Sequence, residues 1–238
     1  MKIALTYTGS EEKHLNYMRW LRGADEVEVI TLSEEAANLD DLLHCDALVI
    51  SGGVDVHPSF YDKKKEYAHA PQKFNKKRDK FESAAFLQSQ ERQIPLLAVC
   101  RGMQLINCIL GGDLVQDLGH RGNAIHRAGD VGDKAHGATV EPGTQLAAIL
   151  GTRRIVVNSA HHQCVHHAGQ GLRINCLADD GTPEGWEWKE PADKSFLLGV
   201  QWHPERMFRF GLEATAPAMA LRAHFIEAII QSKKNERN

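Results

Sequence analysis

Cys100 stands at the point where an apolar run is followed directly by a helical one. Residues 94–99 read as a buried strand, and residues 101–110 have the composition of a helix. A sharp turn from strand to helix resembles a nucleophile elbow, which presents a side chain at the carboxyl edge of a sheet. The helix N-terminus favours the thiolate, the nucleophilic form of cysteine. Cys100 is therefore the candidate nucleophile, and an ordinary buried thiol is the alternative if it is taken alone.

A second apolar run, residues 196–201, is followed by His203 and Glu205. These two side chains point the same way in an extended chain, and Pro204 is expected to keep the segment from becoming helical. A carboxylate beside a histidine fixes its tautomer and stabilises its charged form, so Cys100 would gain a base and an orienting acid. The alternative is a structural histidine, since the chain has 13 of them. The coincidence of two strand-end motifs favours a catalytic triad.

A third motif, Ser51-Gly52-Gly53, follows the expected strand at residues 46–50. Glycine permits positive φ and a close approach of the backbone to a ligand. Backbone N–H groups of this loop, together with the N–H of Arg101, could therefore stabilise an oxyanion. For a bare Gly-Gly pair, a simple turn is the alternative.

The elements that must position these motifs alternate between strand and helix in the first half of the chain. Strands are expected at residues 2–7, 27–32, 46–50 and 94–99, and helices at 11–22, 78–92 and 101–110. The second half is richer in strands, at 138–141, 154–157, 172–178, 185–189 and 196–201, before a helix at 214–231. This order predicts an α/β fold with a mostly parallel central sheet flanked by helices and a smaller strand-rich extension. No linker-like tract interrupts the chain, so residues 1–238 are expected to form a single domain.

Composition argues against several classes of partner. The 238 residues are 42% hydrophobic and 25% charged, as in soluble globular proteins. The net charge of -3 and the lack of a basic stripe argue against nucleic acid. No apolar stretch suits a bilayer or a signal peptide, so we expect a cytoplasmic protein without membrane contact. Five cysteines without a Cys-x-x-Cys pair fit reduced thiols. A homodimer is compatible with all of these features.

Together, the three motifs resemble the class I glutamine amidotransferase superfamily. Within it, the chain is most similar to the C26 peptidase branch, especially the γ-glutamyl-γ-aminobutyrate hydrolases. The resemblance covers nearly the whole chain. It rests on residues 51–58, Tyr61, Arg78, Asp79, Glu82, 100–107, Gly111, Gly112, 116–118, 158–163, Asp180, Gly181, Glu184 and 199–205.

This resemblance implies the flavodoxin-like α/β fold of the amidotransferases. It also implies Cys100 as nucleophile, His203 as general base and acid, and Glu205 as the carboxylate that orients His203. The backbone N–H groups of Gly53 and Arg101 would form the oxyanion hole. Residues expected to contact the substrate are Gly52, Gln104, His161 and Gln163, and residues that would brace the site are Arg78, Asp79 and Glu82.

The reaction implied by the resemblance is hydrolysis of the γ-glutamyl amide bond of a small γ-glutamyl amine, such as γ-glutamyl-γ-aminobutyrate. The Cys100 thiolate would form a γ-glutamyl thioester, and water would then release glutamate. This chemistry needs no metal and no organic cofactor. The histidine pairs His161-His162 and His166-His167 lack the carboxylate or thiolate spacing of a recognised metal site.

Two other functions remain compatible with the motifs. One is a glutaminase subunit that supplies ammonia to a separate synthetase, and the other is a catalytically silent γ-glutamyl-binding protein. The chain also departs from many relatives, with Ala98 in place of a glycine and with bulky Trp186 and Trp188. If either indole faced the cleft, the preferred leaving amine would differ.

Overall fold

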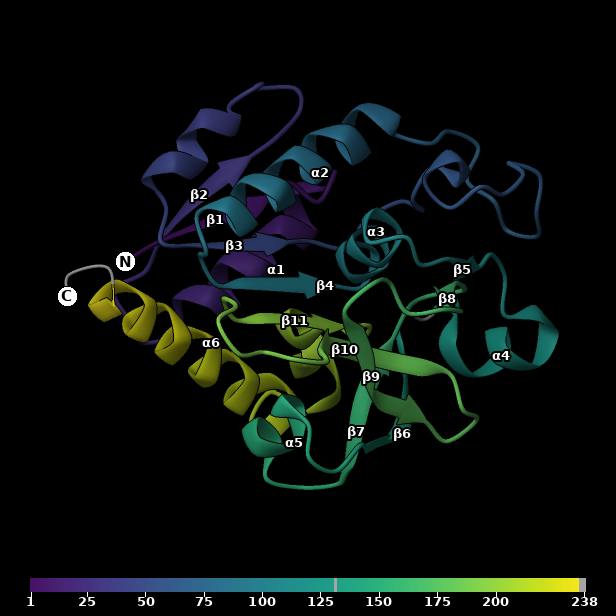
Figure 1. Ribbon diagram of the computed structural model, residues 1–238. Coiled ribbons are helices and arrows are strands. Elements are labelled where there is room, and N and C mark those ends of the chain that lie inside the picture. Colours follow the sequence, from purple (N-terminus) through teal and green to yellow (C-terminus); the bar gives the residue numbers. More distant parts are fainter. Residues whose placement is uncertain (131, 236–238) are drawn as a thin grey trace.

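One large sheet runs through the protein in the computed structural model, which describes residues 1–130 and 132–235 (Figure 1). Within these residues nine strands form the sheet, in the order β2-β1-β3-β4-β11-β10-β9-β6-β7, and β5 pairs with β8 in a separate ribbon. The strands are β1 (Lys2–Thr6), β2 (Glu28–Leu32), β3 (Ala47–Ile50), β4 (Leu96–Val99), β5 (Leu114–Val115), β6 (Lys134–Val140), β7 (Arg154–Ser159), β8 (Cys164–Val165), β9 (Leu172–Ala178), β10 (Pro183–Trp188) and β11 (Leu197–Val200).

One half of the sheet is parallel and the other is antiparallel. β2, β1, β3, β4 and β11 run parallel to one another. β10, β9, β6 and β7 extend the edge of β11 by antiparallel pairing. The predicted α/β class is therefore confirmed, and the strand-rich extension continues the same sheet.

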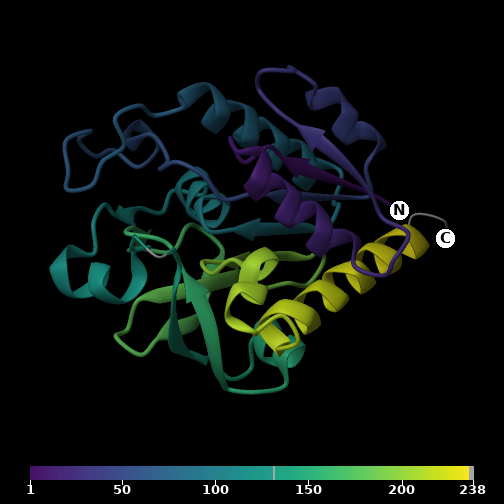
Figure 2. The ribbon, with the colours of Figure 1, turned by 180° about the vertical axis from the view of Figure 1, so that it is seen from behind.

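Helices cover both faces of the parallel half (Figures 1 and 2). α1, α5 and α6 bury apolar side chains against one face, whereas α2 and α3 bury theirs against the other. None of the helices in the described ranges is both long and apolar enough to cross a membrane. The helices are α1 (Glu11–Arg22), α2 (Lys76–Glu91), α3 (Arg101–Ile109), α4 (Gly119–His126), α5 (Gln145–Leu150) and α6 (Ala216–Asn235), with 3-10 helices η1 (Leu39–His44), η2 (Pro58–Phe60) and η3 (Pro204–Phe210).

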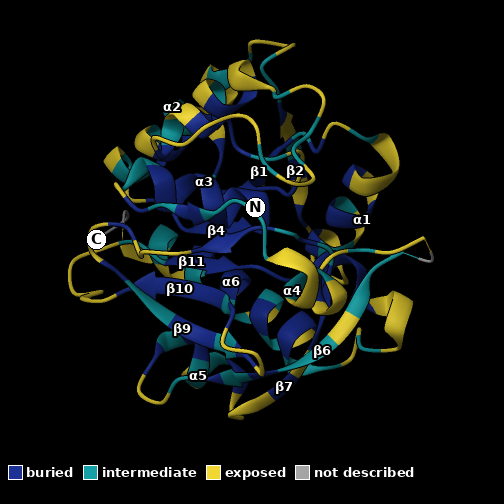
Figure 3. Ribbon diagram, turned by 90° about the vertical axis from the view of Figure 1, so that its right-hand side faces the viewer, coloured by how far each residue is buried: buried dark blue, intermediate teal, exposed yellow. Residues whose placement is uncertain are grey.

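The central strands lie in the best-buried part of the molecule (Figure 3). Every residue of β3, β4 and β11 is buried, which explains why these strands read as continuous apolar runs rather than alternating ones. Successive side chains serve opposite faces: Leu97 and Val99 join the core under α1 and α6, and Leu96 and Ala98 join the core under α2 and α3. The loops that carry the three motifs therefore each follow a fully buried strand.

Each strand and helix expected from the sequence is present, with ends shifted by a few residues. The helix expected at 78–92 begins earlier, at Lys76, because the Asn75 side chain accepts a hydrogen bond from the Arg78 N–H at 3.1 Å and caps it. β5, β8, α4 and α5 were not predicted. β5 and β8 have two residues each and α5 has six, so they are too short to show a period.

Candidate active site

Three neighbouring parallel strands bring the three motifs to one edge of the sheet. β4 lies between β3 and β11, with Ala98 opposite Ile50 and Val99 opposite Val200. The strands end at nearly the same level, so the loops that follow them meet. The Cys100 N–H donates to the Val200 carbonyl at 2.7 Å, which ties the elbow to β11.

Cys100 occupies a strained backbone conformation between β4 and α3. Its φ of 51° and ψ of -109° lie in a region that non-glycine residues seldom adopt. Such strain costs about 1–3 kcal/mol and persists only where the surroundings enforce it. Gly102 is part of that enforcement, because a Cβ there would lie 2.2 Å from the Ile50 carbonyl oxygen. α3 therefore packs directly on the end of β3, and the thiol lines a cavity of about 300 Å³.

Cys100, His203 and Glu205 lie in one buried cluster. His203 Nδ1 and Glu205 Oε1 are 2.8 Å apart, and both residues line the same cavity as Cys100. Because Nδ1 pairs with Glu205, Nε2 is the His203 nitrogen that remains free to exchange a proton with the thiol. Gln201 Nε2 donates to the same sulfur at 3.4 Å. These contacts suit the roles expected for the three residues, a nucleophile, a base and an orienting carboxylate.

The segment that holds His203 and Glu205 is not extended, so this part of the sequence prediction was wrong. Pro204 opens the 3-10 helix η3, and Glu205 lies in its first turn. A proline restricts the residue before it, and His203 is indeed non-helical at φ -112° and ψ 86°. Proline itself suits the first helical position, since its missing N–H would have no partner there. The turn brings the carboxylate back onto the imidazole.

Electrostatics favour a thiolate–imidazolium pair. Burial raises the pKa of the Cys100 thiol, but the positive charge of the neighbouring His203 outweighs this, and the pKa lies below the ordinary cysteine value. Burial and Arg206 lower the pKa of His203, yet Glu205 and Cys100 raise it more, to about 9. Burial raises the pKa of Glu205, and His203 brings it below its usual range. All three shifts favour the state in which Cys100, His203 and Glu205 are charged together.

The other cysteines provide an internal comparison. All five thiols are free and buried. Burial raises the pKa of Cys45 to about 11 and of Cys164 to about 12, and it raises those of Cys108 and Cys176 as well. Cys100 is the one cysteine whose pKa falls, because it is the one beside a histidine–carboxylate pair.

Two backbone N–H groups point to an oxyanion hole. The Gly52 N–H donates to the Tyr17 hydroxyl at 3.0 Å, so it is occupied. Within residues 1–130 and 132–235, no hydrogen bond is made by the N–H groups of Gly53 or Arg101. Gly52 also needs to be glycine, because a Cβ would lie 2.9 Å from Cε1 of His203.

A buried network of four charges holds the glycine loop against the elbow. Arg101 pairs with both Asp79 and Glu82, and Arg78 Nε lies 2.8 Å from Glu82 Oε1. Arg78 also donates to the Gly52 carbonyl at 2.9 Å. Burial raises the pKa of Glu82, but the two arginines lower it further, below its usual range. The bracing role expected for Arg78, Asp79 and Glu82 agrees with these contacts.

Three of the expected substrate contacts lie behind the cavity wall. Gln104 Nε2 donates to the Gln163 carbonyl and to Gln201 Oε1, each at 3.1 Å. His161 Nδ1 lies 2.9 Å from the Gln163 carbonyl. None of the three is among the residues that line the cavity at Cys100, whereas Gly52 and Gly53 are. Gln104 donates to Gln201, and Gln201 in turn donates to the Cys100 sulfur.

Several cavity residues were not expected from the sequence. Lys13 on α1 and Arg209 on η3 line the cavity, and so do Arg206 and Asp133, which pair with each other at 2.8 Å between Nε and Oδ2. A single lysine on an amphipathic helix carries no motif, so Lys13 gave no signal. Arg206 directly follows the triad carboxylate, and that adjacency could have identified it.

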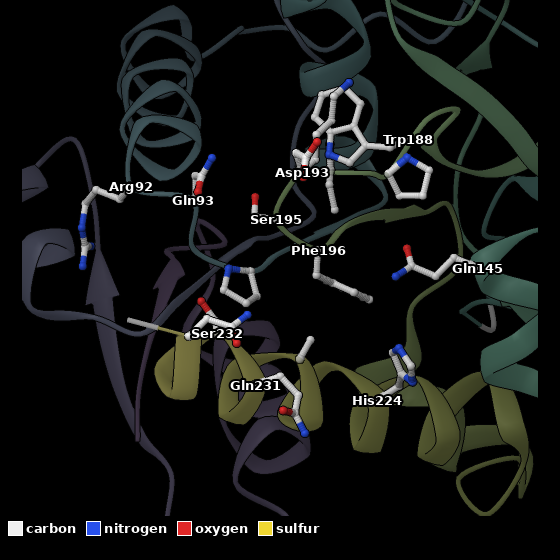
Figure 4. Close-up of a pocket in the computed structure, with 16 residues that line it drawn as sticks. Arg92, Gln93, Gln145, Trp188, Asp193, Ser195, Phe196, His224, Gln231 and Ser232 are labelled. Carbon is white, nitrogen blue, oxygen red and sulfur yellow. The ribbon is translucent and has the colours of Figure 1, made fainter. Parts of the chain in front are cut away.

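The two tryptophans do not face the Cys100 cavity. Trp186 is fully buried, and its Nε1 donates to the Met103 carbonyl at 3.2 Å. Trp188 instead lines a larger cavity of about 770 Å³, shown in Figure 4. That cavity also contains Pro95 and Phe196, which precede β4 and β11, so it lies at the opposite end of the strands. Cavity size alone would have selected the wrong end of the sheet.

The chain is similar in sequence to several known proteins. The sequence profile of the peptidase C26 family matches residues 6–205. The glutamine amidotransferase-like protein YvdE of Lactococcus lactis is 36% identical over 163 residues, covering 67% of this chain and 66% of that protein. The gamma-glutamyl-gamma-aminobutyrate hydrolase of Escherichia coli O157:H7 is 28% identical over 204 residues, 82% of this chain and 78% of that protein.

A solved structure shares the fold. The crystal structure of a glutamine amidotransferase from Thermotoga maritima matches with a TM-score of 0.63 at 12% identity, over 97% of this chain and 96% of that one. The chain spans about half to two thirds of the length of the curated relatives it matches first.

The pKa shifts predict how Cys100 reacts with pH. We expect iodoacetamide to modify Cys100 first among the five cysteines, with a rate that rises with pH through an apparent pKa below that of an ordinary cysteine thiol. In Glu205→Gln the imidazolium loses its carboxylate partner, so the rise should move to higher pH. Peptide mass spectrometry measures each rate. An unchanged profile in Glu205→Gln would contradict this electrostatic explanation.

The four-charge network predicts a large stability effect. Glu82→Gln leaves two buried arginines with one carboxylate, and we expect the free energy of unfolding to fall by about 3–5 kcal/mol. Asp179→Asn, which breaks the exposed Arg154–Asp179 pair, is the control and should leave the unfolding curve unchanged. Urea unfolding measures both. Similar curves for the two variants would show that the network does not brace the site.

Proposed function

Because the chain belongs to the peptidase C26 family, as its motifs predicted, we propose that it hydrolyses the γ-glutamyl amide bond of a small γ-glutamyl amine. The observation that carries this proposal is the lowered pKa of Cys100 beside the His203–Glu205 pair. The family match supports amide hydrolysis, and the arrangement of these three residues supports a covalent route.

In the first half of the proposed reaction the enzyme is acylated. The Cys100 thiolate attacks the γ-carbonyl carbon, and the carbonyl oxygen becomes an oxyanion. The N–H groups of Gly53 and Arg101 donate to that oxygen, and one such donor stabilises a transition state by about 3 kcal/mol. The His203 imidazolium then protonates the amide nitrogen, the C–N bond breaks, and the amine leaves a γ-glutamyl thioester on Cys100.

In the second half, His203 is neutral and accepts a proton from water. The resulting hydroxide attacks the thioester, the same two N–H groups stabilise the second oxyanion, and the C–S bond breaks. Glutamate leaves, and the thiolate and imidazolium are restored. Glu205 stabilises the charged imidazole at both stages and fixes its orientation.

The cavity favours a small substrate with carboxylates. Its volume of about 300 Å³ lies at the small end of the range for ligand sites. Lys13 and Arg209 line it, and since Arg209 already pairs with Glu12, the Lys13 ammonium is the group that could receive the α-carboxylate of a glutamyl group. The name of the Escherichia coli relative contains γ-glutamyl-γ-aminobutyrate, a compound whose leaving amine carries a second carboxylate. We therefore propose γ-glutamyl-γ-aminobutyrate as the particular γ-glutamyl amine that the protein hydrolyses.

A second candidate is a glutaminase that supplies ammonia to a separate synthetase. The amidotransferase name of the Lactococcus lactis relative favours it. The same triad would act on free glutamine, with ammonia as the leaving group. The two functions therefore differ in the leaving amine and in the need for a partner.

The test is glutamate release from a panel of γ-glutamyl amides. The panel contains γ-glutamyl-γ-aminobutyrate, other γ-glutamyl amines, γ-glutamyl peptides and glutamine. We expect turnover of one γ-glutamyl amine, and a loss of kcat by at least about 10⁴-fold in Cys100→Ala, as for other triad nucleophiles. Cys45→Ala is the matched control, because it removes a buried thiol from a site without a base and should retain kcat.

The outcomes separate the candidates. Turnover of glutamine alone would support the glutaminase. Affinity for γ-glutamyl compounds without turnover of any of them, with each protein folded, would indicate a binding protein and overturn the proposal. Equal activity of Cys100→Ala and the wild type would remove Cys100 from the mechanism.

A further inference from the structure

Four buried side chains meet beside the active site and take no part in the proposed reaction. His126 ends α4, His136 lies on β6, His161 follows β7, and Glu184 lies on β10. We call these four residues the histidine–glutamate cluster. Glu184 Oε1 lies 3.5 Å from His126 Nδ1, 3.5 Å from His136 Nε2 and 3.3 Å from His161 Nε2. The Glu184 side chain is fully buried, and the most exposed of the three imidazoles has an exposed fraction of 7%.

In each imidazole one nitrogen faces Glu184, and we call it the inward nitrogen. The other, outer nitrogen faces a different oxygen acceptor. His126 Nε2 lies 3.0 Å from Asp180 Oδ2, and His161 Nδ1 lies 2.9 Å from the Gln163 carbonyl. His136 Nδ1 lies 3.1 Å from the Gly137 carbonyl. An oxygen acceptor requires a proton on the nitrogen that faces it, so in the neutral rings the inward nitrogens carry lone pairs.

The centre of the cluster therefore contains acceptors without donors. In the described part of the chain, both Glu184 oxygens and the inward nitrogens of His136 and His161 have no hydrogen-bond partner. The Ser159 hydroxyl is 3.4 Å from His126 Nδ1, but it donates to the His126 carbonyl at 2.9 Å. A buried carboxylate facing three lone pairs is strongly unfavourable unless a cation lies between them.

The spacing fits a metal ion. Ligand atoms about 2.0–2.2 Å from a tetrahedral zinc lie about 3.3–3.6 Å from one another. The three Glu184–histidine separations fall within this range, and the four ligand atoms all lie within 4.8 Å of one another. Charge-assisted hydrogen bonds that shared protons instead would be shorter, about 2.7–2.9 Å.

We propose that the histidine–glutamate cluster binds one Zn²⁺ ion with a structural role. Four protein ligands fill a tetrahedral site and leave no position for water, as in structural zinc sites. The outer contacts of the three histidines, above all that of His126 with Asp180, are the type that orients zinc ligands. The ion would join α4, β6, the segment after β7, and β10. Ala160, next to His161, lines the Cys100 cavity, so the ion would hold one wall of that cavity in place.

The sequence could not reveal this site. Its ligands come from four segments far apart in the chain, and the structure separates the histidine pairs that the sequence suggested. His162 pairs with Asp55 and Asp117, whereas His166 and His167 pair with the more exposed Asp113. Of the sequence-suggested histidines, His161 alone belongs to the cluster. The proposal does not depend on the proposed function.

The test is direct metal binding. The full chain is stripped with a chelator and titrated with Zn²⁺ alone by calorimetry, and then with Co²⁺, whose visible absorption reports tetrahedral coordination. We expect one tight site per chain and a tetrahedral Co²⁺ spectrum. Glu184→Gln keeps the shape but removes the charge, and it should weaken Zn²⁺ binding by at least about 100-fold. Asp113→Asn, in the exposed group with His166 and His167, is the matched control and should bind as the wild type does.

Several results would overturn the proposal. These are the absence of a stoichiometric site in the wild type, unchanged affinity in Glu184→Gln, or loss of binding in Asp113→Asn. If Glu184→Gln does not fold, His136→Gln replaces it, since His136 lies at the most exposed side of the cluster. The same loss of affinity and of the Co²⁺ spectrum is expected. A His136→Gln protein that retains both would exclude the site.

Discussion

The site depends on one physical constraint: a negative thiolate must be stable in a place that excludes most water. Burial alone raises the pKa of a thiol, as it does for the other four cysteines. The pKa of Cys100 is lowered instead, because His203 supplies a positive charge. Glu205 favours that charge, since its Oε1 lies 2.8 Å from His203 Nδ1. The rest of the fold can be understood as the means of holding these three groups in contact.

The parallel half of the sheet supplies the positions. β3, β4 and β11 are adjacent and fully buried, so their carboxyl ends form a rigid edge. The network of Arg78, Asp79, Glu82 and Arg101 then fastens the glycine loop to the first turn of α3. Gly53 and Arg101, whose N–H groups make no hydrogen bond within the described residues, therefore lie beside the strained cysteine. The antiparallel half carries His136 and Glu184 of the histidine–glutamate cluster. Ala160, next to His161 of the same cluster, lines the cavity at Cys100.

The sequence predicted the family, the fold class and the strands that carry the three motifs, because long apolar runs and strand-end polar residues are local signals. Contacts of residues that lie outside these motifs, or that depend on side-chain packing, were not predictable. Pro204 was expected to keep the chain extended, but it begins a 3-10 helix, since proline favours that position as much as it restricts its neighbour. Gln104 and Gln163 pack behind the cavity, and Lys13 reaches it from a helix face that carries no motif.

The central claim is that Cys100 carries the glutamyl group during turnover. The most direct measurement mixes the enzyme with γ-glutamyl-p-nitroanilide, quenches in acid within the first turnover, and locates any added mass by peptide mass spectrometry. A good leaving group speeds acylation relative to hydrolysis, so the thioester should accumulate. We predict a glutamyl adduct on the peptide that contains Cys100, and its loss in Cys100→Ala. Release of nitroaniline without an adduct, at the same rate in both proteins, would contradict the account.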